Sequence, residues 1–194
     1  MSNEERGKRE SRKKMIIGIV LVSIMVFGTA GYAFFSNPSE GGKRETVEYN
    51  GIKFILNDAG FWEFNLQFGS FVTRYNPKET ENISVPVLST INSYSGRPLY
   101  FAGQSESEIE IVRGLQGFIS KLQYNVCIEN YECEDEIAPI KNCSRDNVIL
   151  FKESNFTEIK EDDGCIFISA PYNEQVRAAD AFLFKILGIR KLYF

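Results

Sequence analysis

One uncharged stretch constrains this chain more than any other feature. Residues 15–35 contain no charged side chain and are mostly apolar, with Ser23 and Thr29 carrying small hydroxyl groups. An α-helix rises about 1.5 Å per residue, so about 20 apolar residues cross a hydrocarbon core about 30 Å thick. A hydroxyl in such a helix can hydrogen-bond to the helix's own backbone. We therefore expect residues 15–35 to form a transmembrane helix that anchors the chain in a lipid bilayer.

The charges beside this stretch indicate its orientation. Residues 1–14 carry six Lys and Arg against three Glu, whereas residues 36–42 carry only the acid Glu40. Positive charge next to a membrane helix favours the cytoplasmic side. We therefore expect residues 1–14 to be a basic cytoplasmic head. Residues 36–45 would then be a short linker on the other side of the cell membrane, and residues 46–194 an extracytoplasmic domain.

Two other interpretations of the apolar stretch remain open. Gly31-Tyr32-Ala33 has the small-x-small pattern of a signal-peptide cleavage site, but the apolar run exceeds the usual 7–15 residues of a cleaved signal, which favours retention. A pilin-like subunit would continue this helix into its domain. Asn37-Pro38 and Gly41-Gly42 argue against that continuity, because Pro and Gly interrupt helices.

The composition of the remainder excludes several classes of function. Residues 36–194 keep 16 of the 22 Lys and Arg and 23 of the 26 Asp and Glu, a net charge of −7. Such an acidic body argues against nucleic acid as a partner. The chain has no His, which removes His general bases, Ser–His and Cys–His nucleophile pairs, and His-ligated metals. About 150 residues suit one domain with a sizeable core.

The cysteines predict how that domain is stabilised. Cys127, Cys133, Cys143 and Cys165 are an even number, and their spacing lacks the CxxC pairs of zinc or redox sites. Outside the membrane this pattern predicts two structural disulfides, and we favour Cys127–Cys133 with Cys143–Cys165 among the three possible pairings. Free or catalytic thiols are the alternative.

Local patterns predict strands in the first half of the domain. Residues 46–49 and 52–56 flank Asn50-Gly51, the pair that a type I′ hairpin turn prefers. Residues 62–68 alternate apolar and polar side chains, and Gly69-Ser70 would turn the chain into a partner strand at 71–75. An edge strand is expected over 83–88, because Pro86 cannot donate to a central ladder.

Helices and short strands follow. Ser107–Glu110 has the capping-box pattern, and a helical apolar face follows it at Ile111, Val112, Leu115, Phe118, Ile119 and Leu122. A second amphipathic helix is expected from Asn173 to Gly188. Buried strands are expected at residues 98–101, 124–128, 147–151 and 165–169. The predicted fold class is therefore α+β: a mainly antiparallel sheet with two helices on one face, stabilised by disulfides.

Candidate site residues are few. Asp180 lies within the apolar arc of the last helix, and we expect it either to pair with Arg177 or to cap another segment. Asn82, Asn142 and Asn155 begin N-x-S/T sequons and are possible glycosylation sites. The acids between the cysteines lack the spacing of a Ca²⁺ loop, and no phosphate-binding or nucleophile motif is present. No catalytic residue, metal ligand or cofactor is predicted.

These observations predict a single-pass membrane protein with one extracytoplasmic domain. Its expected role is non-catalytic: binding a protein partner or ligand, or serving envelope assembly. The alternatives are an envelope enzyme that uses carboxylates or unpaired thiols, and a pilin-like subunit. A deep pocket with converging acids would favour the enzyme, and an exposed apolar patch or open sheet edge the binding module.

Overall fold

The computed structural model describes residues 44–133, 135 and 137–190, which form one compact unit. The predicted cytoplasmic head, the transmembrane helix at 15–35 and nearly all of the linker lie outside these residues. No helix in the described ranges is long and apolar enough to cross a membrane.

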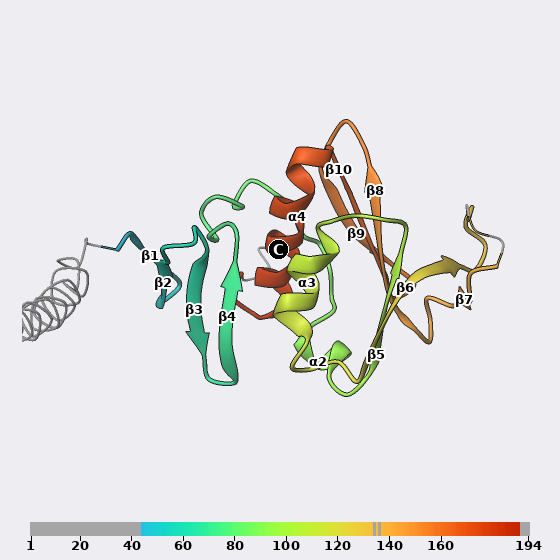
Figure 1. The fold of residues 1–194 in the computed structure, drawn as a ribbon, viewed down its shortest axis with the longest axis horizontal. Helices are drawn as coiled ribbons and strands as arrows, with labels where there is room; N and C mark the ends of the chain where they lie inside the picture. Colours follow the sequence, from blue (N-terminus) through green and yellow to red (C-terminus); the bar gives the residue numbers. More distant parts are fainter. Residues whose placement is uncertain (1–43, 134, 136, 191–194) are drawn as a thin grey trace, which may run out of the picture. The chain divides into compact units, whose positions relative to one another are not determined.

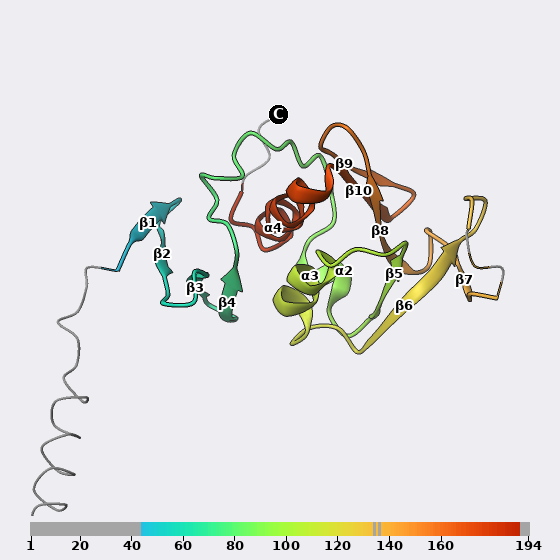
Figure 2. The same ribbon diagram turned by 45° about the horizontal axis from the view of Figure 1, so that its top comes forward.

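The described residues fold into three layers, with helices between two β-sheets (Figure 1). Seen from a second direction, α3 and α4 again lie between the sheets (Figure 2). The first sheet has the order β1 (Thr46–Tyr49), β2 (Ile52–Leu56), β3 (Trp62–Leu66), β4 (Gly69–Thr73). The second has the order β7 (Ile140–Lys141), β6 (Lys121–Ile128), β5 (Pro98–Ala102), β8 (Asn147–Glu153), β10 (Cys165–Ala170), β9 (Glu158–Asp162). The helices are α2 (Ile91–Tyr94), α3 (Glu108–Leu115), the 3₁₀ turn η1 (Tyr172–Glu174) and α4 (Gln175–Ile186).

The first sheet is antiparallel throughout. Its first turn is confirmed, because Asn50 and Gly51 both have positive φ, 51° and 78°. The second turn is shifted by two residues, since Leu66 pairs with Gly69. This register places Phe71 opposite Phe64 and stacks their rings 5.5 Å apart. Phe68, expected on the core face of the strand, instead lies in the turn and is 48 % exposed.

The second sheet differs from the mainly antiparallel arrangement that the sequence predicts. The β6–β7, β5–β6, β5–β8 and β8–β10 pairs are parallel, and only β9–β10 among the described pairs of this sheet is antiparallel. The chain leaves β5, crosses over through α3 and returns as β6, which makes the two strands parallel. The α+β class and two disulfides are confirmed, with the helices packed between two sheets instead of on one.

The central helices are shorter than their sequence patterns suggest. α3 ends at Leu115, and Leu122 belongs to β6. Ser107 makes no capping bond; its own N–H donates to Ser105 Oγ at 3.1 Å, so the expected capping box is wrong. α4 ends as predicted before Gly188, whose φ is +76°.

α4 is buried on two sides because it lies between the sheets. Every residue from 178 to 184 is buried, although an amphipathic helix exposes one face. Phe182 packs toward Tyr94, and Phe184 meets Phe54 and Phe64 of the first sheet. The main core thus contains side chains from both sheets, and Asp180 lies inside it.

The strand expected at residues 83–88 does not form. The chain from 74 to 90 is irregular, and the Glu161 carboxylate accepts the backbone N–H groups of Leu88 (2.6 Å) and Ser89 (3.1 Å). Glu161 belongs to β9, a strand that the sequence analysis did not predict. Asp163-Gly164 makes the turn from β9 to β10, with φ values of 48° and 91°.

Both disulfides are present with the favoured pairing. Cys127 bonds to Cys133 and Cys143 to Cys165, with Cα–Cα distances of 5.6 and 4.8 Å. All four cysteines are therefore bridged. A second, smaller core lies on the sheet face away from the helices and includes Tyr100, Val126, Ile128, Val148, Cys165 and Phe167. Half-buried Cys143 packs against this core, so its bridge ties the loop before β8 to the sheet.

Candidate functional site

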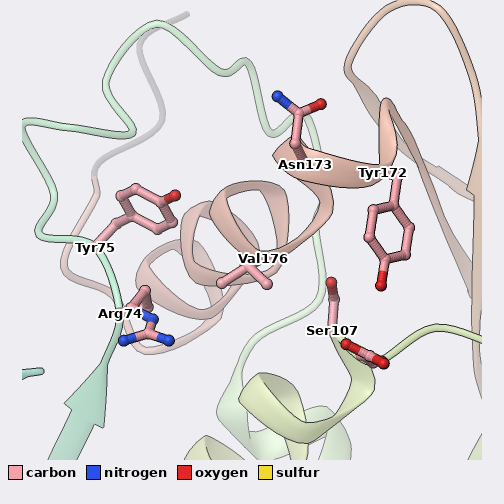
Figure 3. Close-up of a pocket in the computed structure, with 7 residues that line it drawn as sticks. Arg74, Tyr75, Ser107, Tyr172, Asn173 and Val176 are labelled. Carbon is pink, nitrogen blue, oxygen red and sulfur yellow. The ribbon is translucent and has the colours of Figure 1, made fainter.

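An open hollow of about 260 Å³ lies where three loops meet (Figure 3). These loops follow β4, β5 and β10, and β5 and β10 run in the same direction on either side of β8. In open sheets, ligands bind beyond the carboxyl ends of parallel strands, where loops rather than packed strands form the surface. The lining residues are Arg74, Tyr75, Glu106, Ser107, Tyr172, Asn173 and Val176.

A buried hydrogen-bond network holds two of these loops together. Ser105 Oγ donates to Gln175 Oε1 at 2.6 Å and accepts the N–H of Ser107 at 3.1 Å. Gln175 is buried and its amide also donates to the Ala170 carbonyl at 3.4 Å. The network joins the loop after β5 to the start of α4, so the walls of the hollow are fixed before any ligand arrives.

Gly103 sets the path of the loop after β5. Its φ is +80°, and a Cβ at this position would lie 2.8 Å from the Phe151 carbonyl oxygen of β8. Only glycine fits such a close backbone approach.

Hydroxyl groups face the hollow. Ser107 is 3 % exposed, and its hydroxyl makes no hydrogen bond to any residue that the structure describes. The Tyr172 side chain is 63 % exposed, and Figure 3 shows its hydroxyl directed toward the loop that carries Ser107. A hydroxyl that lines an open hollow is available to a ligand or to water.

Opposite charges border the same hollow without pairing. Arg74 and Glu106 are both exposed, and neither forms an ion pair with another described residue. The Arg74 guanidinium lies over the Phe61 ring, 4.8 Å from its centre. Arg113 lies over the same ring at 5.0 Å and is neutralised by Glu110 at 2.6 Å.

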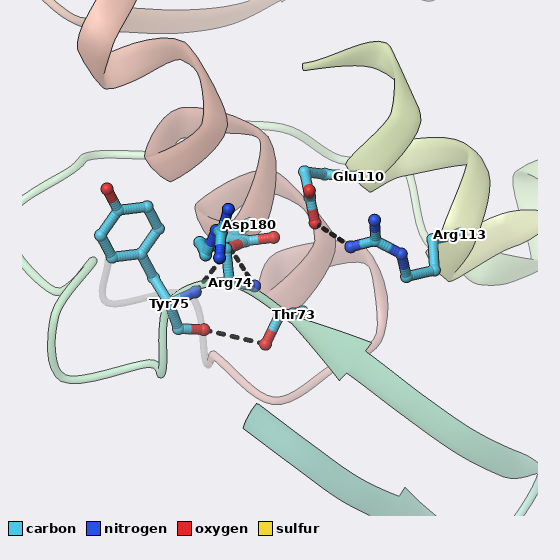
Figure 4. A network of polar contacts seen from close by, with 6 residues as sticks. All are labelled: Thr73, Arg74, Tyr75, Glu110, Arg113 and Asp180. Atoms are coloured by element: carbon cyan, nitrogen blue, oxygen red, sulfur yellow. Dashed lines mark hydrogen bonds and ion pairs between the residues drawn. The ribbon is translucent and has the colours of Figure 1, made fainter. Parts of the chain in front are cut away.

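Asp180 holds the loop after β4 that lines the hollow. It is 0 % exposed, and its Oδ2 accepts the N–H groups of Arg74 (3.0 Å) and Tyr75 (2.8 Å), as Figure 4 shows. Its Oδ1 has no partner among the described residues. Burial raises the pKa of Asp180 well above its usual value, and nearby Glu110 raises it further, whereas the two backbone bonds and Arg113 oppose the shift. Asp180 thus caps the end of β4.

The ion pair expected between Arg177 and Asp180 does not form. Arg177 pairs with Glu174 at 2.8 Å, donates to the Glu79 carbonyl at 2.7 Å and also contacts Asn82. The two residues are three positions apart on α4, but Asp180 points to the end of β4 and Arg177 to the segment after it. The other expectation for Asp180, a cap for a separate segment, agrees with its contacts.

Glu108 is a second buried carboxyl beside this region. It is 8 % exposed, its Oε1 has no partner among the described residues, and burial raises its pKa to about 7. Its charge also raises the pKa of Tyr124, after the larger effect of burial. The burial of Glu108 follows from the packing of α3 against other elements, which no local pattern encodes.

The three sequons differ in their surroundings. Asn155 is exposed in the β8–β9 connection, and its side chain makes no hydrogen bond to a described residue. Asn82 is exposed but contacts Arg177. Asn142 is half-buried, bonds to Glu129 and accepts two bonds from Ser144. Glycosylation remains a prediction, for which Asn155 is the most accessible acceptor.

Comparison with known proteins gives no relative for this chain. No family model, no curated protein and no solved structure matches this chain. Within the described ranges, no group of three or more acidic or cysteine side chains could hold a metal ion. The hollow is therefore the candidate functional site. No local signal marked it, because the sequence analysis interpreted two of its lining residues, Ser107 and Asn173, as helix starts.

Proposed function

We propose that this chain is a single-pass membrane protein whose extracytoplasmic domain binds a ligand non-catalytically. The hollow at the carboxyl ends of β5 and β10 would be the binding site. The uncharged stretch at residues 15–35 and the basic head before it support the anchor and its orientation.

One observation carries the binding role. Buried side chains hydrogen-bond to the loops that form the walls of the hollow. The polar side chains that face the hollow make no hydrogen bond or ion pair to a described residue. Gln175 and Asp180 belong to the first kind, and Ser107, Arg74 and Glu106 to the second. A site that is ordered in advance spends less of its binding free energy on ordering side chains.

The topology is tested by alkylating the thiols of the full chain in its native membrane without reductant and measuring the intact mass. No added label is expected, because both disulfides would persist outside the cytoplasm. Two or four labels would contradict the extracytoplasmic location and would favour an enzyme that uses free thiols. Digestion of whole cells with an added protease is the matched control, since only an outer domain is cleaved.

The binding role is tested by nuclear magnetic resonance of the full chain in detergent, titrated with a library of small polar compounds. Binders should shift the backbone signals of Ser107 and Tyr172 and leave those of Glu48 and Lys53, on the exposed face of the β1–β2 hairpin, unchanged. If no compound shifts the first pair, the hollow is not a small-ligand site.

An envelope enzyme is the second candidate, and Glu108 favours it. A carboxyl with a pKa of about 7 can donate and accept protons near neutral pH. Its test is a screen of chromogenic glycosides and esters from pH 5 to 8, with Glu108→Gln as the variant. Turnover that the variant abolishes would support the enzyme; turnover that survives would exclude Glu108 as its acid or base.

A further inference from the structure

We infer that the hollow binds a small zwitterion, with an ammonium and a carboxylate group on a short carbon skeleton, as in an α-amino acid. The inference rests on the proposed binding role and adds the chemical class of the ligand. Its basis is the pair of opposite, unpaired charges on the two sides of the hollow.

The charges are separated by an apolar floor. Figure 3 shows Val176 between Arg74 on one side and the loop carrying Ser107 on the other. Glu106, which directly precedes Ser107, supplies the negative charge of that loop. A ligand carboxylate would meet the Arg74 guanidinium, whose planar donors suit a carboxylate, and a ligand ammonium would meet Glu106.

Single ions fit this site less well. An anion would gain from Arg74 but would be repelled by Glu106, and a cation would experience the reverse. A neutral apolar compound would gain nothing from either charge or from the Ser107 hydroxyl. A zwitterion satisfies both charges at once, and Ser107 and Tyr172 add hydroxyls beside it.

The size of the hollow limits the ligand further. A volume of about 260 Å³ is at the small end for ligand sites and accommodates one amino acid more readily than a peptide or a nucleotide. Val176 and the Tyr75 ring offer apolar contact to a short aliphatic side chain.

Arg74 is held in place for this role. Its backbone N–H is fixed by Asp180, and its guanidinium rests on Phe61 beside the Glu110–Arg113 pair. Because Glu110 already neutralises Arg113, Arg74 is the cation in this cluster that remains open to a ligand.

The test is isothermal titration calorimetry of the full chain in detergent with L-valine and its two halves. Isovalerate lacks the ammonium group and isobutylamine lacks the carboxylate. L-Valine should bind saturably, and each half at least about tenfold more weakly, since a charge-assisted contact is worth about one power of ten or more.

Variants locate the two charges. Arg74→Gln should weaken L-valine binding about tenfold. It should not weaken isobutylamine binding, because that compound has no carboxylate to lose and is no longer repelled by Arg74. Glu106→Gln should weaken L-valine binding and should not weaken isovalerate binding, because isovalerate has no ammonium to lose and is no longer repelled by Glu106. Lys53→Gln and Glu48→Gln, which remove matched exposed charges on the β1–β2 hairpin, should change nothing.

The outcomes separate this inference from the proposed function. If library compounds shift the signals of the hollow but L-valine, glycine and L-leucine do not bind, the zwitterion is wrong and the binding role stands. If no compound binds, both fail. If L-valine binds equally well to the Arg74 and Glu106 variants, its site lies elsewhere and the inference is overturned.

Discussion

Asp180 joins α4 to the end of β4 through two backbone hydrogen bonds in the core. Asp180→Ala would leave the N–H groups of Arg74 and Tyr75 without their acceptor in a partly buried position. Because each unsatisfied buried group costs about 1–3 kcal/mol, we expect the free energy of unfolding to fall by about 3 kcal/mol. Urea unfolding of the full chain in detergent measures this change.

Two further variants test the reason for that loss. Asp180→Asn keeps one carbonyl oxygen as an acceptor and should cost much less than Asp180→Ala. Arg177→Ala breaks only the contacts at the surface of α4 and should cost about 1 kcal/mol. Equal losses for Arg177→Ala and Asp180→Ala would instead indicate the ion pair that the sequence suggested.

Glu108 predicts a pH dependence of stability. Its pKa rises from 4.5 in the unfolded chain to about 7 in the folded protein, so between these values the folded state binds more protons. Stability is therefore highest below about pH 4.5 and falls as the pH rises toward 7, by at most about 3 kcal/mol for this group. Glu108→Gln should flatten that slope, measured by urea unfolding at pH 5.0 and 7.5.

Asp180 contributes in the same direction, because its pKa is also raised. The Glu108→Gln variant should therefore keep a smaller slope instead of none. A slope identical to that of the unmodified protein would show that Glu108 is solvated in solution.

At the scale of single elements, local chemistry correctly predicted the first hairpin turn and the end of α4. Asn50-Gly51 and Gly188 require positive φ, a property of the residues themselves. The turn after β3 was misplaced because its register depends on Phe71 facing Phe64, a contact between strands. The capping box failed because Ser105, two residues earlier, accepts the bond instead. Local sequence signals predicted a turn or a helix end correctly only where no contact with another part of the chain determined its position.

Two glycines with positive φ allow the effect of local backbone conformation to be separated from the effect of contacts with other elements. Gly60 and Gly164 both have positive φ, but a Cβ on Gly60 meets nothing within 4 Å, whereas one on Gly164 would lie 2.7 Å from the Cys143 carbonyl oxygen. Gly60→Ala should cost about 1–2 kcal/mol from backbone strain alone. Gly164→Ala should cost clearly more, because the β9–β10 turn must move away from the disulfide-bonded loop. Urea unfolding of both variants, without reductant, provides the comparison.

At the scale of the whole molecule, the sequence predicted the α+β class and the disulfides but not the layers. Parallel pairing of β5 with β8 brings together residues almost fifty positions apart, and no local pattern encodes it. The same pairing aligns the carboxyl ends of β5 and β10 and so creates the hollow. Its lining residues come from three distant parts of the chain, which is why the sequence analysis named none of them as a site.

The Cys143–Cys165 bridge and the hollow lie at opposite ends of β10. Cys165 begins this strand, and the loop that lines the hollow follows Ala170 at its other end. The Cys143–Cys165 bridge should therefore affect stability without affecting binding. Cys143–Cys165 spans 22 residues and Cys127–Cys133 only 6, so loop-closure entropy assigns the first bridge about 3 kcal/mol and the second about 2 kcal/mol.

Replacing each pair by alanine tests this assignment. The Cys143→Ala/Cys165→Ala variant should lose more stability toward urea than the Cys127→Ala/Cys133→Ala variant, and adding reductant to the unmodified protein should lower its stability below that of either variant. At urea concentrations where all three remain folded, the signals of Ser107 and Tyr172 should respond to a bound ligand identically. A greater loss of stability in the Cys127→Ala/Cys133→Ala variant would mean that this bridge also maintains packing in the second, smaller core. Loss of the ligand response in the folded Cys143→Ala/Cys165→Ala variant would show that the two ends of β10 are coupled.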